Sequence, residues 1–237
     1  MSIKGNMIKF IHEKENIIYE NSITTINNNE ILIQYYKYIN KSAEIIKILS
    51  TEHINKNEAE LVIQLSGIRI FNSIFSSLNL MLTGYYQSSL SLIRDIFEIA
   101  LLIDFFHHKP DHILKWANAT RNQLLNDYSP SKIRKELHSI YKIDSSKRSS
   151  YYKDLCNFGT HFSPNGTFML ANQNNLATIG PFFNEEKLIR CIEELCININ
   201  SAYLYFSSHF NDLSPKHILL KNQHLCEVEN FLKLIKI

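Results

Sequence analysis

Glycine and proline are scarce in this chain, with six glycines and five prolines among 237 residues. These residues are common in turns, and a β-sandwich or barrel needs a turn about every 8 to 12 residues. A doubly wound fold needs glycine-rich loops between its strands and helices. Hydrophobic residues make up 45% of the chain and charged residues 20%, a balance that suits a folded core. We therefore predict an all-α fold, an irregular antiparallel helical bundle.

Apolar residues recur at intervals of three and four along most of the chain, which is the period of an amphipathic helix. The two most apolar segments, residues 57–82 and 85–106, are separated by Gly84. We expect them to form the central helix pair of the bundle. Further helices are predicted over residues 111–127 and 147–158, the second closed by a glycine.

The first residues of the chain differ from the rest in polarity. Residues 1–29 form a polar N-terminal segment, in which we expect one short helix over residues 8–19 and then an asparagine-rich linker. Residues 30–237 are expected to form a single helical domain.

One segment interrupts the helical pattern. Residues 159–184 hold three of the six glycines and two of the five prolines. A loop of more than about 15 residues inside a compact domain tends to be functional or disordered. A small hairpin within residues 160–183, pairing 167–170 with 176–179, is an open alternative for part of it.

The cysteines and the apolar segments indicate where in the cell the protein is expected to be. The four cysteines contain no Cys-x-x-Cys pair, and the N-terminus lacks the apolar stretch of a signal peptide. We predict a reduced, cytoplasmic protein. The segment 88–106 is the longest apolar candidate for a membrane span. It carries four charged residues, and inserting each of them at the centre of a bilayer costs free energy: Arg94, Asp95, Glu98 and Asp104. We therefore predict no membrane association.

Several common catalytic motifs are absent from the sequence. It contains no Gly-x-Gly-x-x-Gly, no phosphate-binding loop, no Gly-x-Ser-x-Gly and no His-Glu-x-x-His. No glutamate is followed three residues later by histidine, as the helical di-iron pattern requires. We therefore predict neither a cofactor nor a metal site.

The strongest site candidate is a charged pair inside an apolar helix. Arg94 and Glu98 are four residues apart, so that they lie on one helix face and can pair. An arginine among apolar residues needs a partner, because an unpaired buried charge costs several kcal/mol. Two interpretations stay open. The pair either fixes the register of the helices or lies at the floor of a cleft, where Arg94 holds an anion and Glu98 orients it.

A histidine stands at the mouth of the long loop. His161 follows the expected end of a helix, and an imidazole with an ordinary pKa suits general acid or base chemistry. Tyr151 and Asn157 are expected to lie near it. We predict that this helix packs beside the central one and brings His161 within about one water of Arg94 and Glu98, as a catalytic group.

Positive charge is concentrated in one stretch of the chain. Between His107 and His161 there are ten lysines and arginines and five acidic residues. Phosphate backbones favour such clusters through counterion release. Arg121 is a candidate phosphate contact in this stretch. RNA is therefore a candidate partner, and the apolar stripe of the last helix allows a homodimer through the C-terminal helices.

Two short motifs resemble a known group of proteins. Residues 84–98, which include Leu-x-Arg-x-x-x-Glu, and the later Gly-Thr-His-x-Ser at 159–163 resemble an uncharacterised bacterial all-helical family. That family is similar to the HEPN superfamily, whose active members are metal-independent endoribonucleases of toxin and phage-defence systems. Those nucleases carry an arginine followed by a histidine after four to six intervening residues. Here Arg134 is followed by His138 after three.

The leading hypothesis is a HEPN-like protein that binds or cleaves RNA in a bacterial stress or phage-defence setting. In it, Arg94 and Arg121 contact phosphate, Glu98 orients Arg94, and His161 is the acid or base. One alternative is a non-catalytic helical module for interaction or dimerisation. The other is a small-molecule sensor whose cleft is lined by aromatic residues such as Trp116.

Overall fold

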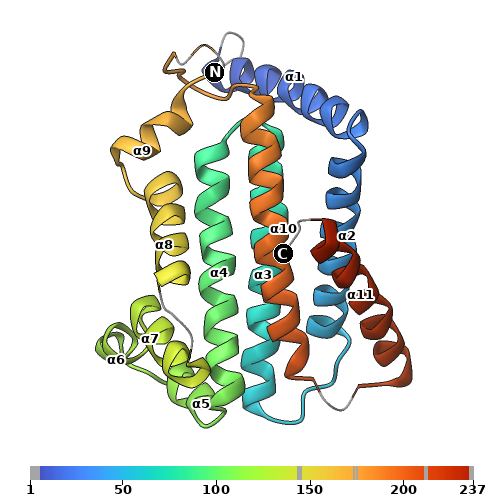
Figure 1. Ribbon diagram of the computed structural model, residues 1–237, viewed down its shortest axis with the longest axis vertical. Coiled ribbons are helices and arrows are strands. Elements are labelled where there is room, and N and C mark those ends of the chain that lie inside the picture. Colours follow the sequence, from blue (N-terminus) through green and yellow to red (C-terminus); the bar gives the residue numbers. More distant parts are fainter. Residues whose placement is uncertain (1–5, 143–145, 173, 175, 211–212, 235–237) are drawn as a thin grey trace.

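The protein is an irregular bundle of α-helices, as the sequence predicts (Figure 1). The computed structural model describes residues 6–142, 146–172, 174, 176–210 and 213–234. The helices in this part of the chain are α1 (Met7–Asn27), α2 (Glu30–Thr51), α3 (Glu58–Leu82), α4 (Tyr86–His108), α5 (His112–Ala117), α6 (Arg121–Asp127), α7 (Pro130–Tyr141), α8 (Ser146–Leu155), α9 (Pro164–Thr167), α10 (Glu185–Ser208) and α11 (Pro215–Leu234).

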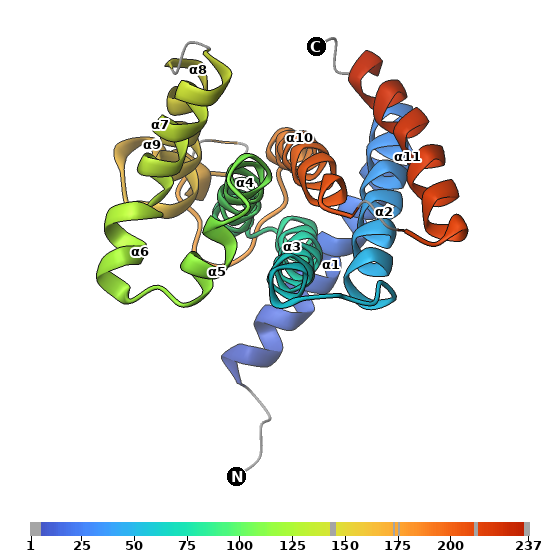
Figure 2. The same cartoon turned by 90° about the horizontal axis from the view of Figure 1, so that it is seen from below.

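The bundle has a central group and two flanks. Helices α3, α4 and α10 lie side by side in the middle, as both views show (Figure 1 and Figure 2). Helices α2 and α11 cover one side, and the shorter helices α5 to α9 cover the other. The expected central pair, α3 and α4, is therefore confirmed, and α10 joins it as a third member. The core consists mainly of Ile, Leu and Phe side chains from these helices.

The break between α3 and α4 depends on Gly84. Its φ of +90° lies in the region that side chains rarely adopt. A Cβ at this position would also lie 2.5 Å from the carbonyl oxygen of Phe182. Any other residue would force the two central helices away from the segment that leads into α10.

By length and composition, α3 is the one helix in the described ranges that is apolar enough to cross a membrane. Its 18-residue apolar window is 44% buried inside the protein. The core helix of a soluble protein meets the same criterion, and α3 packs against α2, α4 and α10.

The N-terminal segment is more ordered than the sequence suggested. A short helix over residues 8–19 was expected, but α1 continues to Asn27 and is followed almost at once by α2. The asparagines make this turn compact, because the Asn29 side chain accepts hydrogen bonds from the first backbone N–H groups of α2. The hydroxyl of Ser22 donates to the carbonyl of Leu82, which fixes α1 to the end of α3.

The single helix expected over residues 111–127 is in fact two, α5 and α6. The chain breaks at Asn118 to Thr120, where Thr120 and Gln123 form a capping box that starts α6. The local capping preference therefore outweighs the continuous helical pattern here.

The helix expected over residues 147–158 is α8, which ends at Leu155. One π-helical turn, Cys156–Thr160, follows it directly. Gly159 makes the close approach of this turn to α4 possible, since a Cβ there would lie 2.9 Å from the backbone of Leu90. The hydroxyl of Ser91 donates to the carbonyl of Gly159 at 2.5 Å. The predicted packing of this segment beside α4 is thus confirmed.

The segment expected to be a long loop contains short helical elements in place of the first strand of the alternative hairpin. Residues 164–167 form α9, and Phe168–Leu170 form a 3-10 turn where a strand was considered. Ala171 and Ala177 form one isolated antiparallel β-bridge. The backbone N–H of Thr178 donates to the carbonyl of Leu170 at 2.9 Å.

The last helix packs within the chain. Val228 and Phe231 of α11 are buried, and the Phe231 ring stacks on Tyr38 of α2 with 4.3 Å between ring centroids. Part of the apolar stripe that suggested dimerisation therefore covers α2. A homodimer through the C-terminal helices stays a prediction.

Candidate functional site

A row of ionisable side chains lies where α4 meets α7 and α8. Residues of α7 and α8 at intervals of three and four face α4. We call the following nine side chains the polar seam: Arg94, Glu98, Asp104 and His108 on α4, Arg134, His138 and Tyr141 on α7, and Arg148 and Tyr152 on α8. Contacts between Glu98 and Tyr152 and between Asp104 and Tyr141 tie α4 to both of these helices.

Glu98 is the centre of one half of the seam. Its Oε1 lies 3.3 Å from Nε of Arg94, so the ion pair expected from the sequence is present. The hydroxyl of Tyr152 donates to the same oxygen at 2.8 Å. The Arg134 guanidinium stacks on the Tyr152 ring, with Cζ 3.8 Å from the ring centroid. Burial, reinforced by the Glu98 carboxylate, raises the pKa of Tyr152, which therefore stays a hydrogen-bond donor.

Asp104 is the centre of the other half. Its side chain is 1% exposed, and its Oδ1 accepts a hydrogen bond from Tyr141 at 2.5 Å. Nε2 of His108 lies 2.9 Å from the Tyr141 hydroxyl oxygen. Burial raises the pKa of Asp104, against the opposing effects of the Tyr141 hydrogen bond and the positive charge of Arg148.

Unpaired buried atoms gather in this seam. In the described ranges, six buried side-chain nitrogen or oxygen atoms have no hydrogen-bond partner. Five belong to the seam: Arg94 Nε, whose contact with Glu98 is an ion pair of 3.3 Å, and Asp104 Oδ2, Arg134 Nη1, His138 Nε2 and Arg148 Nη1. Leaving a buried polar group unpaired costs about 1 to 3 kcal/mol, and more for a charged group. Four of the five atoms are nitrogens of basic side chains, and each of these side chains is only half-buried.

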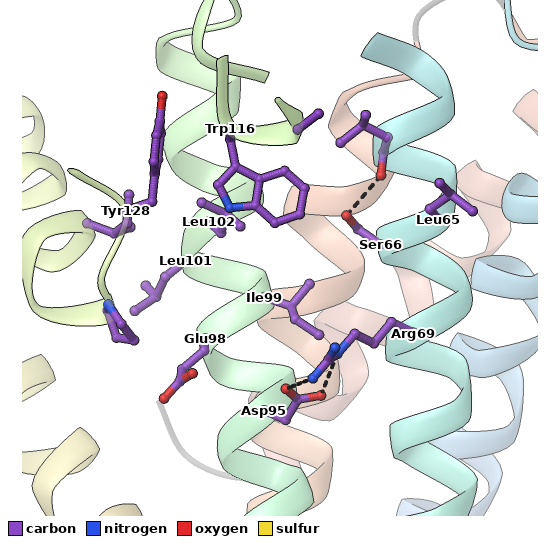
Figure 3. A pocket seen from close by; sticks show the side chains of 14 residues that line it. Leu65, Ser66, Arg69, Asp95, Glu98, Ile99, Leu101, Leu102, Trp116 and Tyr128 are labelled. Carbon is purple, nitrogen blue, oxygen red and sulfur yellow. Dashed lines mark hydrogen bonds and ion pairs between the residues drawn. The ribbon is translucent and has the colours of Figure 1, made fainter. Parts of the chain in front are cut away.

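A cleft of about 540 Å³ opens beside the seam, between α3, α4, α5 and the start of α7 (Figure 3). Its walls are mainly apolar, and Glu98, Trp116 and the pair formed by Arg69 and Asp95 supply most of its polar groups. Arg69 holds Asp95 through two hydrogen bonds, of 3.1 and 2.7 Å. Glu98 belongs to both the cleft and the seam.

Trp116 lies at one end of the cleft, next to Leu102 in Figure 3. Its ring meets that of Phe106 edge to face, with 5.8 Å between centroids. In the part of the chain that the structure describes, its indole N–H makes no hydrogen bond to protein. The predicted residues Trp116 and Glu98 therefore line the same cleft.

His161 does not join this arrangement through any contact among the described residues. Its side chain is exposed, and its backbone N–H donates to the carbonyl of Cys156 at 2.8 Å, which closes the π-helical turn. The structure joins Tyr152, rather than His161, to Arg94 and Glu98. The hypothesis that His161 completes a catalytic site stays a prediction.

The other predicted binding residues lie elsewhere. The hydroxyl of Tyr151 donates to Glu194 at 2.5 Å, and burial raises the pKa of that carboxyl group. The Tyr151 hydroxyl thus bonds to α10, while its ring contacts Phe97 of α4, with 5.4 Å between centroids. Asn157 accepts a hydrogen bond from Ser163 through its backbone carbonyl. Arg121 is exposed as the first residue of α6.

Sequence reasoning missed the contributions of α7 and α8. Arg134, His138 and Tyr141 are spaced by four and three, and Arg148 and Tyr152 by four. This spacing places each set on one helix face. The signal was present within the basic stretch, but the spacing alone does not reveal which helix those faces meet.

No protein-family model, curated protein or solved structure matches this chain. Across the described ranges, no three His, Cys, Asp or Glu side chains converge in the way that would hold a metal ion.

Proposed function

We propose that this protein binds RNA, with the phosphate backbone of the strand lying along the polar seam. The observation that carries this proposal is a row of half-buried basic side chains, Arg94, Arg134, His138 and Arg148, of which the last three each have a buried nitrogen without a hydrogen-bond partner among the described residues. A guanidinium donates several hydrogen bonds in a plane and matches the oxygens of a phosphate. The choice of RNA and of a bacterial stress or phage-defence setting follows the HEPN-like resemblance.

The surroundings of the seam favour a polyanion over a single small anion. Exposed lysines follow the same two helices that supply the arginines: Lys132 and Lys135 on α7, and Lys147 and Lys153 on α8. A strand with several phosphates can contact both the half-buried arginines and these exposed cations. Each contact releases counterions, which strengthens binding at low salt.

Cleavage of the bound strand is a further part of this proposal. Charge that develops on phosphate oxygens in the transition state is stabilised by fixed cations, so that no metal is required in principle. Glu98 would hold Arg94 in place for this role. His138, whose Nε2 is unpaired within the seam, and the exposed His161 are the two candidate proton-transfer groups.

The test is binding of a labelled single-stranded RNA at several salt concentrations. We expect Arg134→Gln and Arg148→Gln each to weaken binding at least 10-fold and to reduce the salt dependence by about 0.7 per lost phosphate contact. Arg190→Gln is the matched control, because Arg190 is an exposed arginine on α10 that pairs with Glu193. Melting temperatures verify that each variant folds.

Equal affinity of wild type and both seam variants would contradict the proposal and favour the helical interaction module. Incubation of the same RNA with wild type, Arg94→Lys and His161→Ala then tests cleavage. An enzyme loses activity in these variants while its fold is kept, whereas a structural ion pair lowers the melting temperature of the Arg94 variant.

A further inference from the structure

The cleft beside the seam has the size and lining of a site for a planar ligand. Its volume of about 540 Å³ lies within the range of small-molecule sites in proteins. Leu65, Ile99 and Leu102 supply apolar walls from α3 and α4. Asp95 does not offer a free acceptor, because Arg69 and Ser73 donate to its two oxygens.

An aromatic surface lies at one end of this cleft. Trp116 and Tyr128 both line it, and Figure 3 shows their rings on the side of α5 and the segment that precedes α7. Nucleobases stack on such rings, with about 1 to 3 kcal/mol for each base. The aromatic end therefore suits a base that has left the stack of its own strand.

A free acceptor lies at the other end. Oε1 of Glu98 is used by Arg94 and Tyr152, whereas Oε2 accepts no hydrogen bond from the residues that the structure describes. Leu102, beside Trp116, and Glu98 are one helical turn apart, about 6 Å along the axis of α4. A base that stacks near Trp116 can reach across this distance to the carboxylate.

The seam and the cleft are continuous at α7. Ile133 lines the cleft, and the next residue, Arg134, belongs to the seam. Glu98 also belongs to both, so a strand whose phosphates lie along α7 and α8 can direct one base toward Glu98 and the cleft.

We infer that the cleft seats one guanine base of the bound RNA, stacked on Trp116 and hydrogen-bonded to Glu98. This inference rests on the proposed function and adds a base preference to it. Guanine presents two neighbouring N–H donors, and both can point toward the free Oε2, which has two lone pairs. The corresponding edges of adenine, cytosine and uracil place an acceptor oxygen or nitrogen beside the donor, and the carboxylate repels it.

The chain carries its own probe for this site, because Trp116 is its single tryptophan. The full-length protein is titrated with GMP, AMP, CMP, UMP and ribose 5-phosphate while tryptophan fluorescence is followed. We expect GMP to quench the fluorescence at concentrations at least 10-fold lower than the other nucleotides. Ribose 5-phosphate should leave it unchanged. Quenching by ribose 5-phosphate, or equal quenching by all four nucleotides, would overturn the guanine site.

Two variants locate the site. Glu98→Gln replaces one acceptor with a donor and should abolish the preference for GMP. Trp116→Leu should weaken binding of a guanine-containing RNA about 10-fold, whereas Trp116→Phe, which keeps an aromatic ring, should retain most of it. Normal RNA binding by Trp116→Leu, with melting temperatures unchanged, would overturn the inference.

The failures of the two proposals are distinguishable. Salt-dependent RNA binding that needs Arg134 and Arg148, without any quenching by GMP, overturns the guanine site and leaves RNA binding intact. Selective quenching by GMP without RNA binding supports the base site and contradicts the proposed RNA function.

Discussion

The two flanks of the bundle differ in the partners that their polar side chains have. On the flank of α2 and α11, Tyr38 stacks on both Phe231 and His224, and the His224 ring contacts Ser42 at 2.9 Å through Nε2. On the flank of α7 and α8, basic side chains are brought together with unpaired nitrogens. Helix α2 packs against α3 and α10, whereas α7 and α8 pack against α4. Under the proposed function, the first flank contributes mainly stability and the second binds the ligand.

Helix length follows the same division. Helices α2 and α11 have 22 and 20 residues, whereas α5, α6, α7 and α8 have 6, 7, 12 and 10. Isolated helices shorter than about 12 to 15 residues are marginal in water, so the short ones depend on packing. Binding elements are commonly drawn from the less stable parts of a protein. A strand bound along α7 and α8 would stabilise that flank most.

The largest effect is expected on the aromatic flank. Phe231→Ala removes a buried ring that stacks on Tyr38 and should lower the free energy of unfolding by about 3 to 5 kcal/mol. Urea denaturation measures this loss. RNA binding at a temperature where the variant is folded should match wild type. A loss below about 1 kcal/mol would mean that α11 is not a structural part of the bundle.

The next effect is a pH dependence on the same flank. Burial lowers the pKa of His224 from 6.5 to about 4, while Glu227 and Lys41 act in opposite directions on it. The unfolded chain therefore binds a proton that the folded chain excludes between these pH values. Stability should rise as pH rises through this window and fall as pH falls, by up to about 3 kcal/mol.

His224→Gln tests this dependence, because glutamine can still hydrogen-bond to Ser42 but does not titrate. We expect urea denaturation between pH 4.5 and 7, a range that covers most of this window, to give a flatter profile for the variant. Parallel profiles for the variant and wild type would assign the acid sensitivity to another group.

The smallest effect is expected on the seam. Tyr152→Phe removes the hydrogen bond to Glu98 and should cost about 1 kcal/mol, since the carboxylate is partly exposed. For a domain of this size the melting temperature should fall by about 2 to 4 °C. The ring that supports the Arg134 guanidinium is kept, so RNA affinity should change little. A loss as large as that of Phe231→Ala would contradict the division between the flanks.

Local patterns in the sequence determine the helices and one ion pair. Helical periodicity and the scarcity of glycine and proline predict the all-α fold and the central helices α3 and α4. The pair of Arg94 and Glu98 is also predictable, because residues four apart in one helix are neighbours whatever surrounds them. Competing local signals caused the errors. The cap at Thr120 starts a new helix within a segment that apolar spacing predicted as one helix.

Only the tertiary structure decides which faces meet. Arg134 and Tyr152 come from helices more than 30 residues beyond Glu98 in the chain, yet the three side chains form one contact group. The spacing within α7 and α8 defines their faces but not their partners, because many packings bury a similar apolar area. The choice among them depends on close contacts such as that of Gly159 with Leu90, which brings α8 against α4 and so places Tyr152 on Glu98.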